Sequence, residues 1–174
     1  MTKAELKDLL ESWENLQYLV TEIARKPEYY KLLIEVAFYD SNPKSWRAAY
    51  LLDRINDLDP GLLRPFLSEM IEQVQIEKST SKKRHFLKLI SLNDLTKKQQ
   101  GFLFDFCIET LTSEKEPIAV RVHAMQILSN IAENELALIP EIVLVIENEM
   151  ENHSTAGIIS RGSKLVQKLR RQIK

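Results

Sequence analysis

Turn-forming and cross-linking residues are scarce in this chain of 174 residues. It has only 4 glycines and 6 prolines, too few for the many tight turns of a β-sandwich or barrel. The single cysteine, Cys107, excludes a disulfide framework. No apolar run approaches the roughly 18 residues needed to span a membrane, and Met1 to Leu10 alternates charge and leucine, unlike a signal peptide. We therefore expect a cytoplasmic protein that contacts no membrane.

A strong excess of one charge is also lacking. The chain has 24 basic and 25 acidic residues, for a formal net charge of −1, which excludes a globally basic nucleic-acid binder but allows a local basic face. Hydrophobic residues make up 44% and charged residues 28%, which is ordinary for a globular protein. This length and composition predict one domain over residues 1–174.

Apolar residues recur at helical spacing along nearly the whole chain. Thr2 and Glu5 have capping-box spacing, and the apolar stripe that follows predicts one long N-terminal helix within residues 1–26, ended by Pro27. Further helices are predicted at 27–40, 43–57, 61–77, 82–94, 97–113, 117–131, 134–152 and 155–173. No segment has the pattern of a strand.

Three residue types recur at a fixed period of 37 residues. The arginines of this pattern are Arg47, Arg84 and Arg121. A carboxylate lies seven residues before each arginine and an asparagine nine residues after it; these residues are Asp40, Glu77 and Glu114, and Asn56, Asn93 and Asn130. Such a match indicates a repeat array, with repeats at 27–60, 61–96 and 97–133 and a degenerate capping repeat at 134–174. Each repeat has two helices, which bury their apolar stripes by stacking on neighbours.

Two of these repeats resemble HEAT repeats in the turn and the second helix. The segments Asn42–Ala49 (NPKSWRAA) and Glu116–Ala124 (EPIAVRVHA) have the family's turn proline or acid, an apolar residue before an arginine, and then alanines. The chain departs from that pattern at Lys83, which replaces the apolar residue before Arg84. The resemblance implies an all-α fold, a right-handed α–α superhelix of HEAT-like helical repeats with about four helix pairs plus the N-terminal helix.

The recurring acids and arginines have two interpretations. The resemblance implies a structural ladder in which each arginine bridges the carboxylate that ends the preceding helix, or its counterpart one repeat away. The ladder residues would be Asp40, Arg47, Glu77, Arg84, Glu114 and Arg121. The alternative is that the arginines line a groove and bind anions. The recurring asparagines are predicted to close their helices as left-handed C-caps.

Basic residues are concentrated on the second helix of each pair. Those helices have fourteen Lys or Arg residues against three acids. The resemblance implies that second helices line the concave surface, which would then be basic and would attract an acidic segment or a phosphate backbone. The predicted partner-binding residues lie outside the ladder columns or lack an acidic partner; they are Arg54, Lys88, Arg161, Lys164 and Lys168. A solvated polar end-cap is the alternative interpretation of the cluster after residue 160.

Signatures of catalysis or metal binding are weak. His85 and His123 are predicted on adjacent second helices, but neither they nor Cys107 have CxxC, HxxxH or HExxH spacing. We expect no catalytic residue, no metal and no cofactor, and we expect Cys107, Trp13 and Trp46 to lie in the core.

These patterns favour a non-enzymatic scaffold. The leading hypothesis is a macromolecular interaction module that binds another protein, through its acidic segment, on the concave, basic second-helix face. The alternative is a nucleic-acid-binding protein resembling the HEAT-like DNA alkylation repair proteins, which cradle a duplex on such a face.

Overall fold

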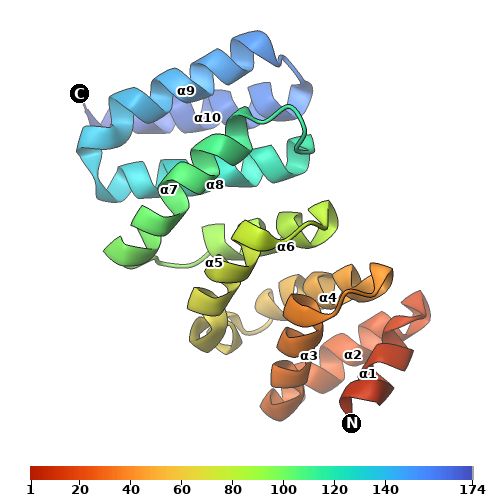
Figure 1. Ribbon diagram of the computed structural model, residues 1–174. Coiled ribbons are helices and arrows are strands. Elements are labelled where there is room, and N and C mark those ends of the chain that lie inside the picture. Colours follow the sequence, from red (N-terminus) through yellow and green to blue (C-terminus); the bar gives the residue numbers. More distant parts are fainter. Residues whose placement is uncertain (174) are drawn as a thin grey trace. The chain divides into compact units, whose positions relative to one another are not determined.

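The protein is built from helices alone over the residues that the structure describes. The computed structural model describes residues 1–173, and within them every regular element is helical (Figure 1). The α-helices are α1 (Lys3–Leu10), α2 (Leu16–Arg25), α3 (Pro27–Tyr39), α4 (Trp46–Asn56), α5 (Leu67–Ile76), α6 (Thr80–Ser91), α7 (Lys97–Thr112), α8 (Ile118–Asn134), α9 (Ile139–Asn152) and α10 (Ala156–Gln172). Consecutive helices pack as pairs, for example α3 with α4, α7 with α8 and α9 with α10. The predicted all-α fold of helical repeats is confirmed.

The chain divides into two compact units, each with its own core. The N-terminal unit comprises Met1–Leu89, and the C-terminal unit begins at Ile90, inside α6. Leucine and isoleucine side chains fill both cores; fully buried examples are Leu33, Leu51 and Ile55 in the first unit and Leu103, Leu128 and Ile146 in the second. No helix could bury its apolar stripe alone, so stacking of helices supplies each core.

Local capping signals set several helix starts. The hydroxyl of Thr2 accepts from the Glu5 amide while the Glu5 carboxylate accepts from the Thr2 amide, so the predicted capping box at the start of α1 is confirmed. Thr96 and Gln99 form the same arrangement at the start of α7. Pro27 is the first residue of α3, where its missing N–H costs no hydrogen bond.

The predicted long N-terminal helix is wrong, because the segment forms two helices. Between α1 and α2, Ser12 caps a short 3-10 turn, η1 (Trp13–Asn15). Arg47 of α4 donates from Nη1 to the carbonyl oxygens of Leu10 and Glu11, both at 2.7 Å. In a continuous helix those carbonyls would accept from amides four residues later. The apolar stripe runs on across the break, so the stripe alone predicted a continuous helix.

Two further helix ends differ from the prediction. The stretch before α5 forms short 3-10 turns at Pro60–Leu62 and Arg64–Phe66, so α5 begins at Leu67 rather than near residue 61. Helix α8 continues to Asn134, and Asn130 therefore lies inside it. No residue within 1–173 has a left-handed backbone, so the predicted left-handed C-caps are wrong.

Candidate interaction surface

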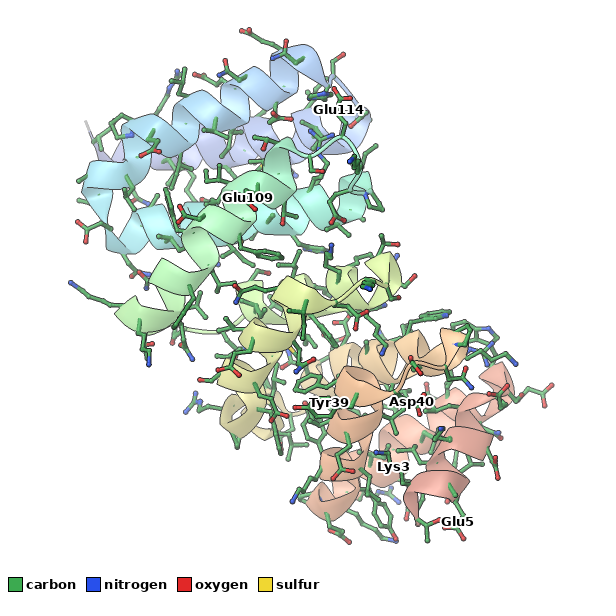
Figure 2. The ribbon with its side chains drawn as sticks, in the orientation of Figure 1. Lys3, Glu5, Tyr39, Asp40, Glu109 and Glu114 are labelled. Carbon is green, nitrogen blue, oxygen red and sulfur yellow. The ribbon has the colours of Figure 1, made fainter. Side chains whose placement is uncertain are left out.

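The three recurring acids bind partners other than the recurring arginines. Asp40 accepts from the Asn42 amide at 2.8 Å and from Lys7 Nζ at 2.7 Å. Glu77 accepts from the Ser79 amide at 2.7 Å. The three carboxylates lie at or just beyond the ends of first helices, as Figure 2 shows for Asp40 after α3 and Glu114 after α7. Their cationic neighbours are Lys7 for Asp40, Lys82 for Glu77 at 3.7 Å, and His153 for Glu114 at 2.9 Å.

Two of the three recurring arginines instead cap the carboxyl ends of helices. Besides the Arg47 contacts with the end of α1, Arg121 Nε donates to the Leu111 carbonyl oxygen, in the last turn of α7, at 2.8 Å. Carbonyls there lack helical partners and carry partial negative charge, so a guanidinium suits them. Arg84 Nη2 lies 3.1 Å from His85 Nε2. Arg47 and Arg121 thus contact helix carbonyls rather than pairing with the predicted ladder acids Asp40 and Glu114.

Arg121 also forms a buried ion pair in the C-terminal unit. Its Nη2 donates to Glu149 near the end of α9, and both side chains are buried. His153 Nδ1 lies 2.8 Å from the same carboxylate, and its Nε2 lies 2.9 Å from Glu114. The hydrogen bond to Glu114, joined by that to Glu149, raises the pKa of His153. These contacts tie the α7–α8 loop to the end of α9.

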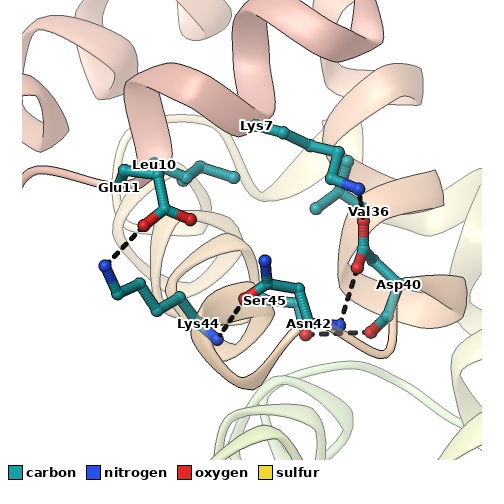
Figure 3. Close-up of a pocket in the computed structure, with 8 residues that line it drawn as sticks. All are labelled: Lys7, Leu10, Glu11, Val36, Asp40, Asn42, Lys44 and Ser45. Atoms are coloured by element: carbon teal, nitrogen blue, oxygen red, sulfur yellow. Dashed lines mark hydrogen bonds and ion pairs between the residues drawn. The ribbon is translucent and has the colours of Figure 1, made fainter.

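A small hollow in the N-terminal unit is bordered by ion pairs and hydrogen bonds between its lining residues. It lies where α1 meets the loop after α3, and Lys7, Asp40, Asn42 and Lys44 are among its lining residues (Figure 3). Lys44 reaches the carboxylate of Glu11 across its mouth. Its volume of about 10 Å³ matches about one water molecule, so it has no room for a larger ligand.

Two predicted partner-binding residues, Arg54 and Lys88, already have acidic partners. Asp53 of α4 is buried and accepts from Lys88 Nζ at 2.7 Å and from His85 Nδ1 at 3.1 Å. Arg54 lies 3.4 Å from Asp57. Burial favours the neutral form of Asp53, but the hydrogen bonds from His85 and Lys88 outweigh burial and lower its pKa. The cluster joins α4 to α6 and gives Lys88 a structural role.

The other three predicted residues lie together in the C-terminal unit. Arg161, Lys164 and Lys168 line a groove of about 610 Å³ between α8 and α10, which we call the α8–α10 groove. Its remaining lining residues are Val122, Gln126, Gly157, Ser160 and Leu165. The lining therefore combines three cations with small, apolar and amide side chains and has no carboxylate. An anionic group would be attracted to it.

Side chains of α8 hold two of these cations in place. Arg161 Nη1 donates to Gln126 Oε1 at 2.8 Å, and Gln126 Nε2 donates to Asn130 Oδ1 at 2.8 Å. Asn130 Nδ2 in turn donates to the Ser91 carbonyl oxygen at 2.8 Å. Lys168 Nζ lies 2.5 Å from Glu133 Oε1. This chain of hydrogen bonds restricts the guanidinium of Arg161 before any partner arrives.

Gln126 and Glu133 were not identified from the sequence. A glutamine on a helix carries no signal by itself, and Glu133 lies beyond residue 131, where the predicted helix ended. Because α8 continues to Asn134, Glu133 belongs to the second helix after all. The longer helix adds one acid to a face that the sequence predicted to be almost wholly basic.

The other residues considered for catalysis, metal binding or the core have no surroundings that suggest a reactive site. Cys107 is fully buried, which raises the pKa of its thiol and leaves it inert. Trp13, predicted in the core, is 52% exposed; its ring lies tilted against Trp46 and edge-on to Tyr50. Within residues 1–173, no group of three or more His, Cys, Asp or Glu side chains is arranged to hold a metal ion. None of the described helices is long and apolar enough to cross a membrane.

Together, the stacked helix pairs and the groove between two second helices define an α-helical repeat protein. The HEAT repeat domain family matches residues 2–169, and the chain belongs to that family. HEAT repeats generally mediate protein interactions. No curated protein and no solved structure matches the chain.

Proposed function

We propose that this protein is a non-enzymatic interaction module that binds an acidic segment of another protein in the α8–α10 groove. The observation that carries the proposal is the composition of the groove, where Arg161, Lys164 and Lys168 meet no carboxylate among the lining residues. Complementary charge of this kind steers a partner to its site and fixes its orientation.

The surroundings of the groove support a carboxylate as the ligand. The carboxylate of Glu133 lies 2.5 Å from Lys168 Nζ, so a carboxylate can reach and pair with this ammonium. Arg161 makes one hydrogen bond within residues 1–173, to Gln126, so most of its N–H donors remain for a partner's carboxylate. Lys164 is exposed, and its ammonium has no ion pair with the described residues.

Arg54 and Lys88 are not part of this proposal. Neither residue lines the α8–α10 groove. Lys88 is also paired with the buried Asp53, and breaking that pair would leave a buried charge without its partner. The proposal therefore rests on three of the five residues predicted from the sequence.

A charge-reversal experiment tests the proposal. The probe is a fluorescein-labelled glutamate-rich peptide, and its anisotropy is followed as the protein is added. We expect saturable binding that weakens at least about tenfold in the variant Arg161→Glu/Lys164→Glu. The matched control is Lys97→Glu/Lys98→Glu, which makes the same change in net charge at exposed residues of α7. The control variant should bind like the parent protein.

The same assay separates the proposal from nucleic-acid binding. Labelled duplex DNA is titrated at about 50 and about 200 mM salt, because phosphate contacts weaken steeply with salt. DNA binding with no peptide binding would replace the proposal by the nucleic-acid alternative. Equal loss of peptide binding in the groove variant and its control would contradict the groove as the site.

A further inference from the structure

The cations of the α8–α10 groove recur at helical steps. Arg161, Lys164 and Lys168 are separated by three and four residues on α10 and line the same groove. At 1.5 Å of rise per residue, their backbone positions span about 10.5 Å along the axis of α10. A partner that engages all three must place its acids with a matching spacing.

Two backbone conformations of a partner meet this requirement differently. A helix whose acids are separated by three and four residues repeats the same span of about 10.5 Å. In an extended strand, side chains on one face recur every 6.6–6.8 Å or so, and three of them span about 13 Å. The extended segment therefore falls out of register with at least one cation, whereas the helix stays in register with all three.

The apolar part of the groove fits the same kind of partner. Val122 of α8 and Leu165 of α10 contribute to the lining beside the cations. Gly157 and Ser160, at the start of α10, add little bulk at that end. An amphipathic helix laid along two packed helices presents apolar residues next to a polar stripe, and this is a recurrent mode of recognition.

We propose that the segment bound in the α8–α10 groove is an amphipathic α-helix with acidic residues at positions i, i+3 and i+7. The inference rests on the proposed function and specifies its partner. The acids pair with Arg161, Lys164 and Lys168, and an adjacent apolar residue packs on Val122 and Leu165. The acid facing Lys168 takes the place of Glu133, which holds that ammonium in the free protein.

Three synthetic peptides of the same composition test the inference. The first is a helix former with glutamates at i, i+3 and i+7. The second has its glutamates distributed around the helix. The third keeps the glutamates at i, i+3 and i+7, but a proline and a glycine from its termini exchange places with two central alanines and break the helix. We expect the first peptide to bind at least about tenfold more tightly than the other two, because only it satisfies all three cations.

The outcomes distinguish this inference from the proposed function. If the helix-broken peptide binds as tightly as the first one, the helical partner is wrong while the acidic groove stands. If none of the three binds, both proposals fail. A charge swap provides a second readout: the variant Arg161→Glu/Lys164→Glu should lose the first peptide but bind its counterpart with lysines at i and i+3. Failure of the swapped pair to bind would contradict the assigned register.

Discussion

Arg161 Nη1 on α10 donates to Gln126 Oε1 on α8 at 2.8 Å. Because Asn130 and the Ser91 carbonyl orient Gln126 in turn, a guanidinium at the surface of the protein is held by three successive hydrogen bonds. An arginine restricted in this way loses less side-chain entropy when a partner binds. The contact explains why Arg161 is the cation of the groove best prepared to bind a carboxylate.

Removing Glu133, the acid outside the groove lining that pairs with Lys168, should strengthen partner binding. The variant Glu133→Gln releases Lys168, whose ammonium is held at 2.5 Å in the parent protein. An exposed pair of this kind is worth about 0.2–1 kcal/mol, so we expect the glutamate peptide to bind about 1.5- to 5-fold more tightly. Anisotropy titration measures the change. Weaker binding would mean that Glu133 supports the site rather than competing for it.

The Asp53 cluster should make stability depend on pH in the acid range. The folded-state pKa of Asp53 lies below its ordinary value of 3.8, so its contribution is present above that value and is lost as the pH falls through the folded-state pKa. At neutral pH, Asp53→Asn should lower the free energy of unfolding by about 1–3 kcal/mol. Urea denaturation should show this gap closing in acid.

The matched control for Asp53 is the neighbouring Asp57→Asn. Asp57 is about half exposed and lies 3.4 Å from Arg54, so its loss should change stability by no more than about 0.5 kcal/mol. If both variants lose the same stability, the buried cluster has no special role.

His153 predicts the opposite pH dependence. Its folded-state pKa is raised above 6.5 by Glu114 and Glu149, so its contribution is complete below 6.5 and is lost as the pH rises through the folded-state pKa. The parent protein should exceed the His153→Gln variant in free energy of unfolding by more at about pH 5.5 than at about pH 9. Urea midpoints at the two pH values measure this. A gap that widens with rising pH would show that the imidazole is not held as a cation.

Two helical glycines should respond oppositely to alanine. A Cβ on Gly101 of α7 meets nothing within 4 Å, whereas on Gly162 of α10 it would lie 2.6 Å from Met150 Sδ and 3.1 Å from Ile146 Cγ2. Gly101→Ala should stabilise the protein by about 0.5–1 kcal/mol through helix propensity. Gly162→Ala should destabilise it by about 1–3 kcal/mol through overpacking of α10 on α9. Chemical denaturation measures both changes. Equal stabilisation by the two substitutions would contradict the close packing of α10 on α9 at Gly162.

The sequence predicted helices well because their signals are local. Thr2 with Glu5, and Pro27 at the start of α3, act within a few residues. The break between α1 and α2 was not predicted, because only part of its stabilisation is local: Ser12 caps the turn, but Arg47 takes the carbonyls of Leu10 and Glu11, 37 and 36 positions earlier. A stripe of apolar residues reports burial and does not reveal such a contact.

The repeat period located the recurring residues but did not identify their partners. Arg121 of α8 pairs with Glu149 of α9 rather than with Glu114. The way in which α8 packs on α9 decides this pairing, and the repeat period does not report it. For the candidate site, the spacing of Arg161, Lys164 and Lys168 on one helix was enough to place them on one face. Gln126 and Glu133 reach that face from α8, so only the packing of α8 on α10 could reveal them.

The most direct test of binding in the α8–α10 groove is a map of where the acidic helical peptide binds. In heteronuclear NMR spectra of the ¹⁵N-labelled full chain, we expect the largest shifts on adding the peptide at Gln126, Arg161, Lys164 and their neighbours on α8 and α10. The variant Arg161→Glu/Lys164→Glu should abolish them. Shifts confined to the Asp53 cluster, or to residues of α9, would contradict the α8–α10 groove as the binding site.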